Sequence, residues 1–401
     1  MLVYYLNLLL ILALAYPLCV YKPSRVKRIA YLCCTFSAMF FLAAARQGIG
    51  NDYFSYIDIY YEAAGSSFFE LFSAGARAEP GYLLLCKLIA LTGASQTVMY
   101  AVMALLCLIP VAVFIYRYSE NLWLSTWLYV TLTFFYGTMN FVRQNLALAI
   151  LLTGYPLLKK RALRPALCYV GVILLAASFH KTALIMLPVL LVCYLPLNRW
   201  LGGAYAFLAL ALYLCSRQLV GWVTDYVYTA YKDLVYLQVG LGYVFLIIPA
   251  LVLLLVLCSK KKLEQHSKEA PLLINLVFYS VLIWLFITRH MVLERFSLYL
   301  YVYVLLLIPM AIELQRPDEK QLADLSRLRQ SAKSSRSKAA GRRLIELTSQ
   351  LNARRAYYYC LMGAVLIASF CYHEFGMHDG NNGFHGVFPY HSLIEALNRL
   401  P

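Results

Sequence analysis

The sequence opens with the apolar run LVYYLNLLLILALAYPLCV, residues 2–20, which holds no charged side chain. A helix over these residues extends about 28 Å, close to the thickness of the hydrocarbon core of a bilayer. No basic residue precedes the run and no small-residue cleavage site follows it, so we interpret it as a retained membrane span. Similar runs recur along the chain, and 62% of its 401 residues are hydrophobic. The sequence therefore predicts an all-α, polytopic integral membrane protein.

The apolar runs predict about twelve transmembrane helices within a single transmembrane domain, residues 1–401. One further apolar run, Gly81–Leu91, is too short to cross a bilayer and carries Lys87, so we interpret it as a re-entrant or interfacial helix. The expected spans lie near residues 2–20, 29–45, 98–116, 121–138, 141–158, 165–179, 182–197, 200–215, 241–258, 271–288, 296–313 and 356–374.

The distribution of basic residues orients these spans. If residues 46–97 form an outer loop with its re-entrant segment, most of the 35 Lys and Arg side chains fall in inner loops, as the positive-inside rule requires. Treating Gly81–Leu91 as a full span would instead force the cluster Lys22–Arg28 to the outer side. We therefore expect both termini on the outer side, with residues 375–401 as an outer C-terminal tail.

The net charge of +16 raises the question of a nucleic-acid partner. The densest basic stretch, Gln315–Arg355, lacks the interleaved aromatic residues of nucleic-acid-binding segments, so no such partner is expected. We interpret it as a cytoplasmic loop, mobile or loosely helical, near the anionic headgroups of the lipid bilayer. The eleven cysteines lie mostly inside apolar runs and show neither disulfide nor zinc spacing, so no metal or other cofactor is expected.

Ionisable residues that border or enter the spans gather on the outer side. Charges at such positions are costly and usually mark a site or a pathway. Guanidinium groups bind diphosphate oxygens, and a carboxylate or an imidazole can deprotonate an attacking hydroxyl. The pattern predicts an outward-facing cavity for a diphosphate-bearing substrate. Its candidate residues are Arg46, Asp52, Glu79, Arg143, His180, Lys181, Arg289, His290, Glu294 and Arg295.

Each candidate also has a structural interpretation that the sequence leaves open. These interpretations are a helix cap for Asp52, a helix-start acid for Glu79, a snorkelling side chain for Arg143, a satisfied buried ring for His180, and a helix-capping ion pair of Glu294 with Arg289 or Arg295. The 34 tyrosines add rings that pack against sugars but also populate interfacial belts.

Five short motifs carry a family resemblance. They are Arg46-x-Gly48-x-Gly50-x-Asp52-Tyr53, Glu79-Pro80-Gly81-Tyr82, Arg143-Gln144-x-x-Ala147, Phe179-His180-Lys181-Thr182-Ala183-Leu184-Ile185 and Arg295-Phe296-x-x-Tyr299. The series resembles the EpsG family of exopolysaccharide and capsule synthesis, which is similar to the Wzy-type O-antigen polymerases. It extends from Arg46 to Tyr303 and to a closing Pro389-Tyr390, whereas Gln315–Arg355 has no family motif.

The resemblance implies a polymerase of the bacterial inner membrane whose active site faces the exterior. It would transfer a glycan from undecaprenyl diphosphate to a sugar hydroxyl of an incoming lipid-linked repeat unit, without a metal ion, and a chain-length regulator is a further implied partner. The implied roles are diphosphate binding for Arg46, Arg143, Arg289 and Arg295 with Lys181, hydroxyl deprotonation by Asp52 or His180, and substrate binding or orientation for Tyr53, Glu79, Gln144, His290, Glu294 and Tyr299.

The C-terminal tail carries several histidines at irregular spacing, among them His378, His385 and His391. Because glycine-rich stretches separate them, we favour an outer flap over the cavity, with Pro389-Tyr390 near the membrane, rather than a metal site.

Other function classes remain open. A flippase for lipid-linked sugars would show mid-span charges, broken helices and an internal repeat, and we find no repeat. A membrane acyltransferase would need an inner-side site, for which the inner loops offer no His or acid cluster. A ligase that makes a single transfer cannot be told from a polymerase by sequence.

Overall fold

The computed structural model describes residues 1–73, 75–226, 240, 242–317, 319–335, 338–378 and 385–392. These residues form helices and connecting loops, with one isolated backbone bridge between Arg46 and Ser392 and no strand in the described ranges. The prediction of an all-α membrane protein is confirmed.

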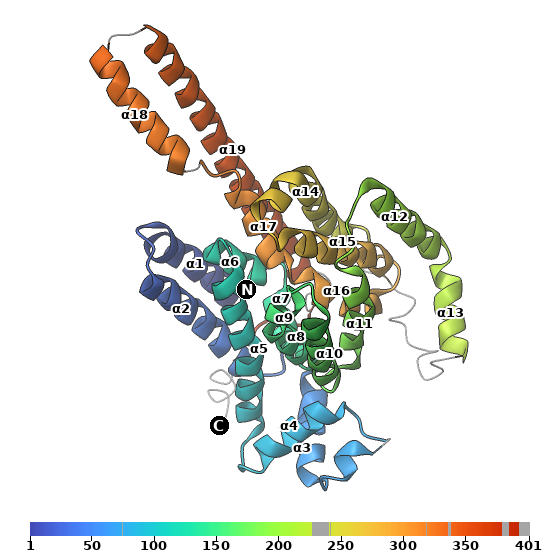
Figure 1. Ribbon diagram of the computed structural model, residues 1–401. Helices are drawn as coiled ribbons and strands as arrows, with labels where there is room; N and C mark the ends of the chain where they lie inside the picture. Colours follow the sequence, from blue (N-terminus) through green and yellow to red (C-terminus); the bar gives the residue numbers. More distant parts are fainter. Residues whose placement is uncertain are drawn as a thin grey trace.

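The helices are named here in chain order, with the labels of Figure 1. In the first half of the chain they are α1 (Leu2–Ala15), η1 (Tyr16–Val20), α2 (Arg25–Ala44), α3 (Tyr53–Gly65), η2 (Glu70–Phe72), α4 (Pro80–Ala90), α5 (Gln96–Tyr118), α6 (Leu122–Thr131), α7 (Phe134–Asn140), α8 (Val142–Thr153), α9 (Tyr155–Leu158), α10 (Leu163–Ala177), η3 (Lys181–Ile185) and α11 (Met186–Val192). In the second half they are α12 (Arg199–Leu214), α13 (Ser216–Tyr226), α14 (Val244–His266), α15 (Ala270–Ile287), η6 (Met291–Leu293), α16 (Glu294–Tyr301), α17 (Val304–Glu313), α18 (Glu319–Ser335) and α19 (Lys338–Met377).

Among the described residues, six helices are long and apolar enough to cross a bilayer. Two bent pairs raise the number to eight if each pair counts as one span, with bends of 65° between α12 and α13 and 53° between α16 and α17. The six continuous helices are Leu2–Val20, Arg25–Ala44, Gln96–Tyr118, Val244–His266, Ala270–Ile287 and Gly341–Met377.

The number of twelve spans is not confirmed and stays a prediction. The runs expected near 121–138, 141–158, 165–179 and 182–197 form the shorter helices α6 to α11. Between α6 and α7, Thr133 has a φ of 66°, a left-handed conformation that an α-helix cannot continue. Because α6 and α7 are buried, protein rather than lipid surrounds this interruption.

The loops expected on the inner side meet at one end of the bundle. The Lys159 ammonium lies 2.8 Å from the Glu269 carboxylate. Asn121 donates a hydrogen bond of 2.8 Å to Glu313, so the start of α6 contacts the end of α17. These contacts join loops that the charge pattern had already grouped together.

The loops expected on the outer side meet at the other end. The Gly50 N–H donates to the Gly386 carbonyl at 2.8 Å, and the Gly81 N–H donates to the Ser178 carbonyl at 2.8 Å. The continuous helix α5, whose 23 residues extend about 34 Å, connects the two ends. Which end faces the exterior stays a prediction.

The stretch Gln315–Arg355, which we expect to be mobile or loosely helical, is largely helical in the described residues. Residues Glu319–Ser335 and the first half of Lys338–Met377 form two regular helices, α18 and α19, that lie side by side and project beyond the bundle (Figure 1). The stretch Glu319–Ser335 contains no proline or glycine and is rich in Leu, Lys, Arg, Gln and Ala, which are good helix formers. Local propensity therefore explains the helical hairpin.

Candidate functional site

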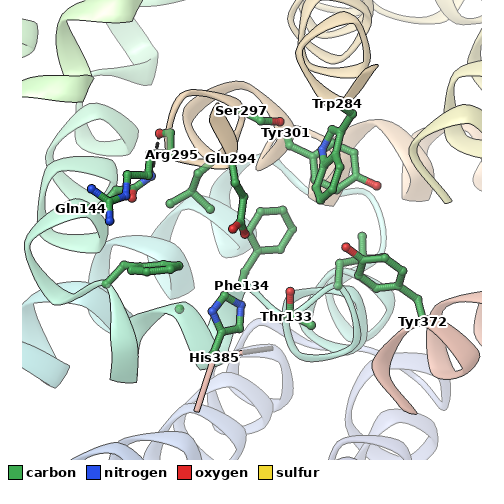
Figure 2. A pocket seen from close by; sticks show the side chains of 14 residues that line it. Thr133, Phe134, Gln144, Trp284, Glu294, Arg295, Ser297, Tyr301, Tyr372 and His385 are labelled. Atoms are coloured by element: carbon green, nitrogen blue, oxygen red, sulfur yellow. Dashed lines mark hydrogen bonds between the residues drawn. The ribbon is translucent and has the colours of Figure 1, made fainter. Parts of the chain in front are cut away.

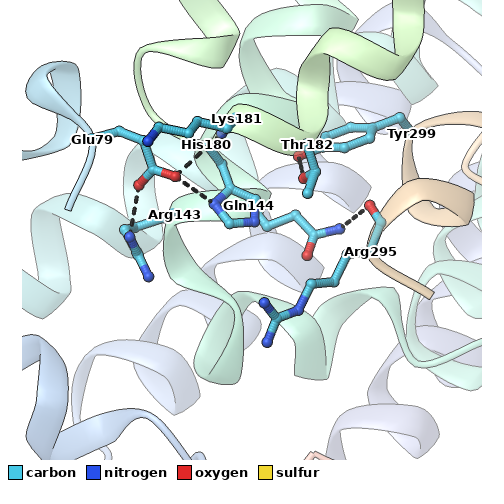
Figure 3. Close-up of polar contacts among 8 residues, drawn as sticks. All are labelled: Glu79, Arg143, Gln144, His180, Lys181, Thr182, Arg295 and Tyr299. Atoms are coloured by element: carbon cyan, nitrogen blue, oxygen red, sulfur yellow. Dashed lines mark hydrogen bonds and ion pairs between the residues drawn. The ribbon is translucent and has the colours of Figure 1, made fainter. Parts of the chain in front are cut away.

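The centre of the candidate site is the Glu79 carboxylate, whose side chain is 8% exposed. Its Oε2 lies 2.6 Å from the Arg143 guanidinium, and its Oε1 lies 3.1 Å from Nδ1 of His180 (Figure 3). The backbone N–H of Lys181 donates to the same Oε1 at 3.2 Å. The carboxylate thus joins α4, α8 and the start of η3, and we call Glu79, Arg143, His180 and Lys181 the Glu79 cluster.

The glycine after Glu79-Pro80 brings these segments into contact. Pro80 starts α4, a position where its missing N–H costs nothing. Gly81 then packs on Ser178, and a Cβ added to Gly81 would lie 2.8 Å from the Ser178 carbonyl oxygen. Only glycine fits there without displacing the turn that carries His180 and Lys181.

Burial of Glu79 opposes its ionisation, but the His180 hydrogen bond and the Arg143 charge together lower its pKa to about 2. The carboxylate is therefore ionised in the folded protein at neutral pH, which explains why it holds a cation and two N–H donors.

This shift predicts a loss of stability in acid. Because its folded-state pKa is below the ordinary 4.5, the Glu79 carboxylate stabilises the folded protein at pH values above about 4.5. This stabilisation is at most about 3 kcal/mol, and it disappears as the pH falls toward 2. We expect the thermal midpoint of the detergent-solubilised protein to fall over this interval. The Glu79→Gln variant is expected to show a smaller acid-dependent fall. An equal fall in both proteins would contradict the assignment.

A second set of contacts places Gln144, Arg295 and Tyr299 beside the Glu79 cluster (Figure 3). Gln144 donates 2.7 Å to the backbone carbonyl of Arg295, and the Thr182 hydroxyl lies 3.0 Å from that of Tyr299. Figure 3 shows the guanidinium groups of Arg143 and Arg295 both directed toward the lower part of the view. In the described part of the chain, no hydrogen bond or ion pair engages the Arg295 guanidinium, which leaves it available to an anion.

A recess lies against Gln144 and Arg295 (Figure 2). Including its opening, the recess has about 480 Å³ of empty space, but only about 30 Å³ admits the centre of a water-sized group. One or two such groups fit, and a sugar ring does not. Phe141, Glu294 and His385 are among the other residues that line it.

Arg46 lies apart from the Glu79 cluster. It is 2% exposed, its guanidinium lies 4.2 Å from the centre of the Tyr100 ring, and it donates to the Ala43 carbonyl at the end of α2. Tyr53 is also buried and stacks on Tyr100. Both residues thus make packing contacts, and substrate binding by either stays a prediction.

Asp52 occupies the position before α3 but makes no side-chain capping hydrogen bond. Its backbone N–H donates 3.4 Å to the side chain of Asn140, just before α8. Among the described residues, the Asp52 carboxylate forms no hydrogen bond or ion pair with the Glu79 cluster. Asp52 is therefore a neighbour of the Glu79 cluster rather than a member, and its role as a base stays a prediction.

Arg289 and His290 contact a different part of the molecule. Arg289 donates 2.8 Å to the Tyr213 carbonyl and lies 3.9 Å from the centre of the Tyr213 ring. Nε2 of His290 lies 3.1 Å from the Ser216 hydroxyl. The structure thus attaches both residues to the α12–α13 turn, and the expectation that Arg289 joins the other arginines receives no support.

Glu294 does not form the expected ion pair. Within the described ranges, its carboxylate lies within 4.0 Å of neither Arg289 nor Arg295, and Figure 2 shows it directed into the recess. Lys181 reaches the Glu79 cluster through its backbone, while its side chain is exposed.

The C-terminal segment 385–392 is the part of the site that the sequence left least defined. The Gln47 N–H donates 3.0 Å to the His391 carbonyl, and the Tyr390 hydroxyl donates 3.0 Å to the Leu42 carbonyl. His385 is 4% exposed, against the ring of Phe141, and burial lowers its pKa to about 3. The segment thus covers the loop after α2 and places a neutral imidazole at the recess.

Sequence reasoning missed His385 as a lining residue. Pro389-Tyr390 was the available signal for the position of the tail, but nothing local distinguishes His385 from the other tail histidines. Among the described residues, which exclude Asp379, no three His, Cys, Asp or Glu side chains lie together as metal ligands.

A family model described as "EpsG family" matches residues 29–324 of the chain, a range that contains every residue of the Glu79 cluster. No curated protein and no solved structure matches the chain.

Proposed function

The chain belongs to the EpsG family, and from this membership we propose that it is a membrane glycosyltransferase that polymerises lipid-linked oligosaccharide repeat units. The donor in this proposal is a glycan on undecaprenyl diphosphate, and the site faces the exterior of the bacterial inner membrane. The outward side follows from the basic end of the bundle, where the Lys- and Arg-rich loops meet.

The observation that carries the proposal is the Glu79 cluster. Glu79 and Arg143 are 64 positions apart in the sequence, and Glu79 and His180 are 101 apart, yet all three side chains meet. Each comes from a different motif of the family resemblance. Ordering three distant segments around one carboxylate costs conformational entropy. Ionisable side chains held together in this way are typical of functional sites, so the cluster supports a substrate site.

The proposed chemistry breaks the bond between the anomeric carbon of the donor glycan and the diphosphate. The hydroxyl oxygen of the acceptor sugar forms the new bond to that carbon, and the diphosphate leaves with the bonding electron pair. Arg143 and Arg295 supply positive charge for the leaving diphosphate. Glu79 holds Arg143 and His180 in place, so that little reorganisation is needed during the reaction.

One structural feature favours a second candidate function. The bends of 65° and 53° and the interruption at Thr133 are broken helices, which a flippase for lipid-linked sugars would also use. The residues of the Glu79 cluster border loops that we expect on the outer side, so we prefer the transferase. Polymerase and ligase share this chemistry, and only the product distinguishes them.

The test is chain growth by the purified full-length protein in liposomes that contain its lipid-diphosphate repeat unit. We expect a ladder of lipid-linked products on a gel, with spacing of one repeat unit, and the same ladder in the presence of a chelator. Repeat units that stay single while lipid-linked sugar crosses the bilayer would contradict the proposal and favour the flippase. A single transfer to an unrelated acceptor would indicate a ligase.

A further inference from the structure

Glu294 is the second carboxylate of the candidate site. It is the first residue of α16 and directly precedes Arg295, whose backbone carbonyl accepts the hydrogen bond from Gln144. This bond attaches the start of α16 to α8, the helix that carries Arg143. Glu294 therefore lies one residue away from a cation of the proposed diphosphate site.

The surroundings of Glu294 are mostly apolar. Phe134, Phe141, Trp284 and Leu298 are among the residues that line its recess. The ionisable groups that face it from the same recess are Arg295 and Tyr301 on its own helix, Tyr372 on α19 and His385 in the tail. In the described ranges, none of these groups forms a hydrogen bond or an ion pair with the Glu294 carboxylate.

The Glu79 and Glu294 carboxylates therefore differ in their ability to accept a proton. Glu79 already accepts from Arg143, His180 and the Lys181 N–H, so both of its oxygens are engaged. A carboxylate with no hydrogen-bond donors and apolar neighbours is the better proton acceptor. Two carboxyl groups in contrasting environments have separate roles in many enzymes.

The size of the recess fits a hydroxyl group. Its inner space of about 30 Å³ admits one or two water-sized groups, so a hydroxyl can enter while the sugar ring stays outside. Neither Asp52 nor His180 lines this space. His180 also has Nδ1 directed at Glu79, which leaves only Nε2 for another partner.

We propose that Glu294 is the general base that takes the proton from the acceptor hydroxyl, and that the recess is the subsite for that hydroxyl. The proton of the hydroxyl moves to a Glu294 oxygen as the hydroxyl oxygen bonds to the anomeric carbon of the donor. The bond from that carbon to the diphosphate breaks, and its electron pair leaves with the diphosphate. This inference rests on the proposed glycosyl transfer and assigns the step that Asp52 and His180 had left open.

The test compares full-length wild-type protein with Glu294→Gln in nanodiscs. Single-turnover extension of a lipid-linked repeat unit and the Kd for a labelled lipid-diphosphate donor are measured for both proteins. Loss of a general base lowers the extension rate about 100-fold or more. We expect this loss for Glu294→Gln, with a Kd within about twofold of the wild type, because donor binding depends on the arginines. Retained donor binding also demonstrates that the variant is folded.

Four further variants extend the comparison. Glu294→Asp keeps a carboxylate and is expected to retain part of the extension rate. Asp52→Asn and His180→Gln are expected to retain the acidic limb of the pH–rate profile, which Glu294→Gln loses. Glu62→Gln changes an exposed carboxylate and is expected to match the wild type.

The outcomes separate the inference from the function on which it rests. If the wild-type protein extends chains and Glu294→Gln extends them at nearly the same rate, Glu294 is not the base. Equal losses of rate and donor affinity would make Glu294 a binding residue and overturn the inference. A wild-type protein that binds donor but extends no chain would overturn the proposed function and the inference together.

Discussion

Replacing Arg143 with alanine is expected to reduce chain growth about 1,000-fold, because it removes a preformed cation from the site of the leaving diphosphate. It also leaves the buried Glu79 carboxylate with only His180 and one N–H donor. Losing one partner of a buried ion pair costs about 3–5 kcal/mol, and the partial exposure of Arg143 lowers the expectation to about 2 kcal/mol. The measurements are single-turnover extension and thermal unfolding in detergent.

A double variant separates the loss of chemistry from the loss of stability. Combining Glu79→Gln with Arg143→Ala removes the uncompensated charge, so we expect thermal stability to recover while extension stays low. Arg77→Ala is the matched control, because Arg77 lies 3.5 Å from Glu62 in an exposed ion pair. It is expected to change stability by less than about 1 kcal/mol and to leave extension unchanged. Wild-type extension by Arg143→Ala would exclude Arg143 from the diphosphate site.

Replacing Gly50 with alanine is expected to cost about 3 kcal/mol of stability. Gly50 has a φ of +97°, and a Cβ at this position would collide with the Met139 carbonyl oxygen and lie 3.1 Å from its carbon. Left-handed strain and steric overlap each cost about 1–3 kcal/mol. Because the Gly50 N–H also holds the Gly386 carbonyl, the tail segment 385–392 is expected to loosen. Thermal unfolding and proteolysis of the tail measure the two effects.

Alanine variants of two other glycines separate the cost of backbone strain from the cost of steric overlap. Gly93 has a φ of +72° with no atom within 4 Å of an added Cβ, so Gly93→Ala measures backbone strain alone. Gly65 has neither a positive φ nor a close neighbour, so Gly65→Ala is expected to be nearly neutral. If Gly50→Ala is no worse than Gly93→Ala, the close approach of the loop to α7 does not matter for stability.

The sequence correctly predicted a short apolar helix around Gly81–Leu91, and the structure has the 11-residue helix α4 there. The sequence did not predict which residues the start of this helix contacts. The structure shows that α4 presents Glu79 and Gly81 to the turn before η3. Periodicity and length identify such a helix, since they depend only on neighbouring residues. The partner of its first turn depends on the packing of α4 and α10, which no local pattern encodes.

The four candidate arginines are a second case in which the sequence did not predict the contacts of a side chain. Arg46, Arg143, Arg289 and Arg295 are equally plausible phosphate ligands by type and by position at span edges. The structure places Arg143 and Arg295 around Gln144, encloses Arg46 against Tyr100, and attaches Arg289 to Tyr213. A span-edge arginine that packs on an aromatic ring and one that faces a cavity have the same sequence signature.

The sequence by itself determined that the chain is helical and membrane-embedded, which loops share an end of the bundle, and which motifs relate it to a family. Apolar length and charge asymmetry act through the local free energy of transfer into lipid, so they are readable residue by residue. Only the tertiary structure decided that Glu79 holds Arg143 and His180, that Glu294 faces a recess, and that His385 lines it. These contacts join segments far apart in the chain, and their geometry comes from the close packing of many helices, in which a shift of one turn would separate them.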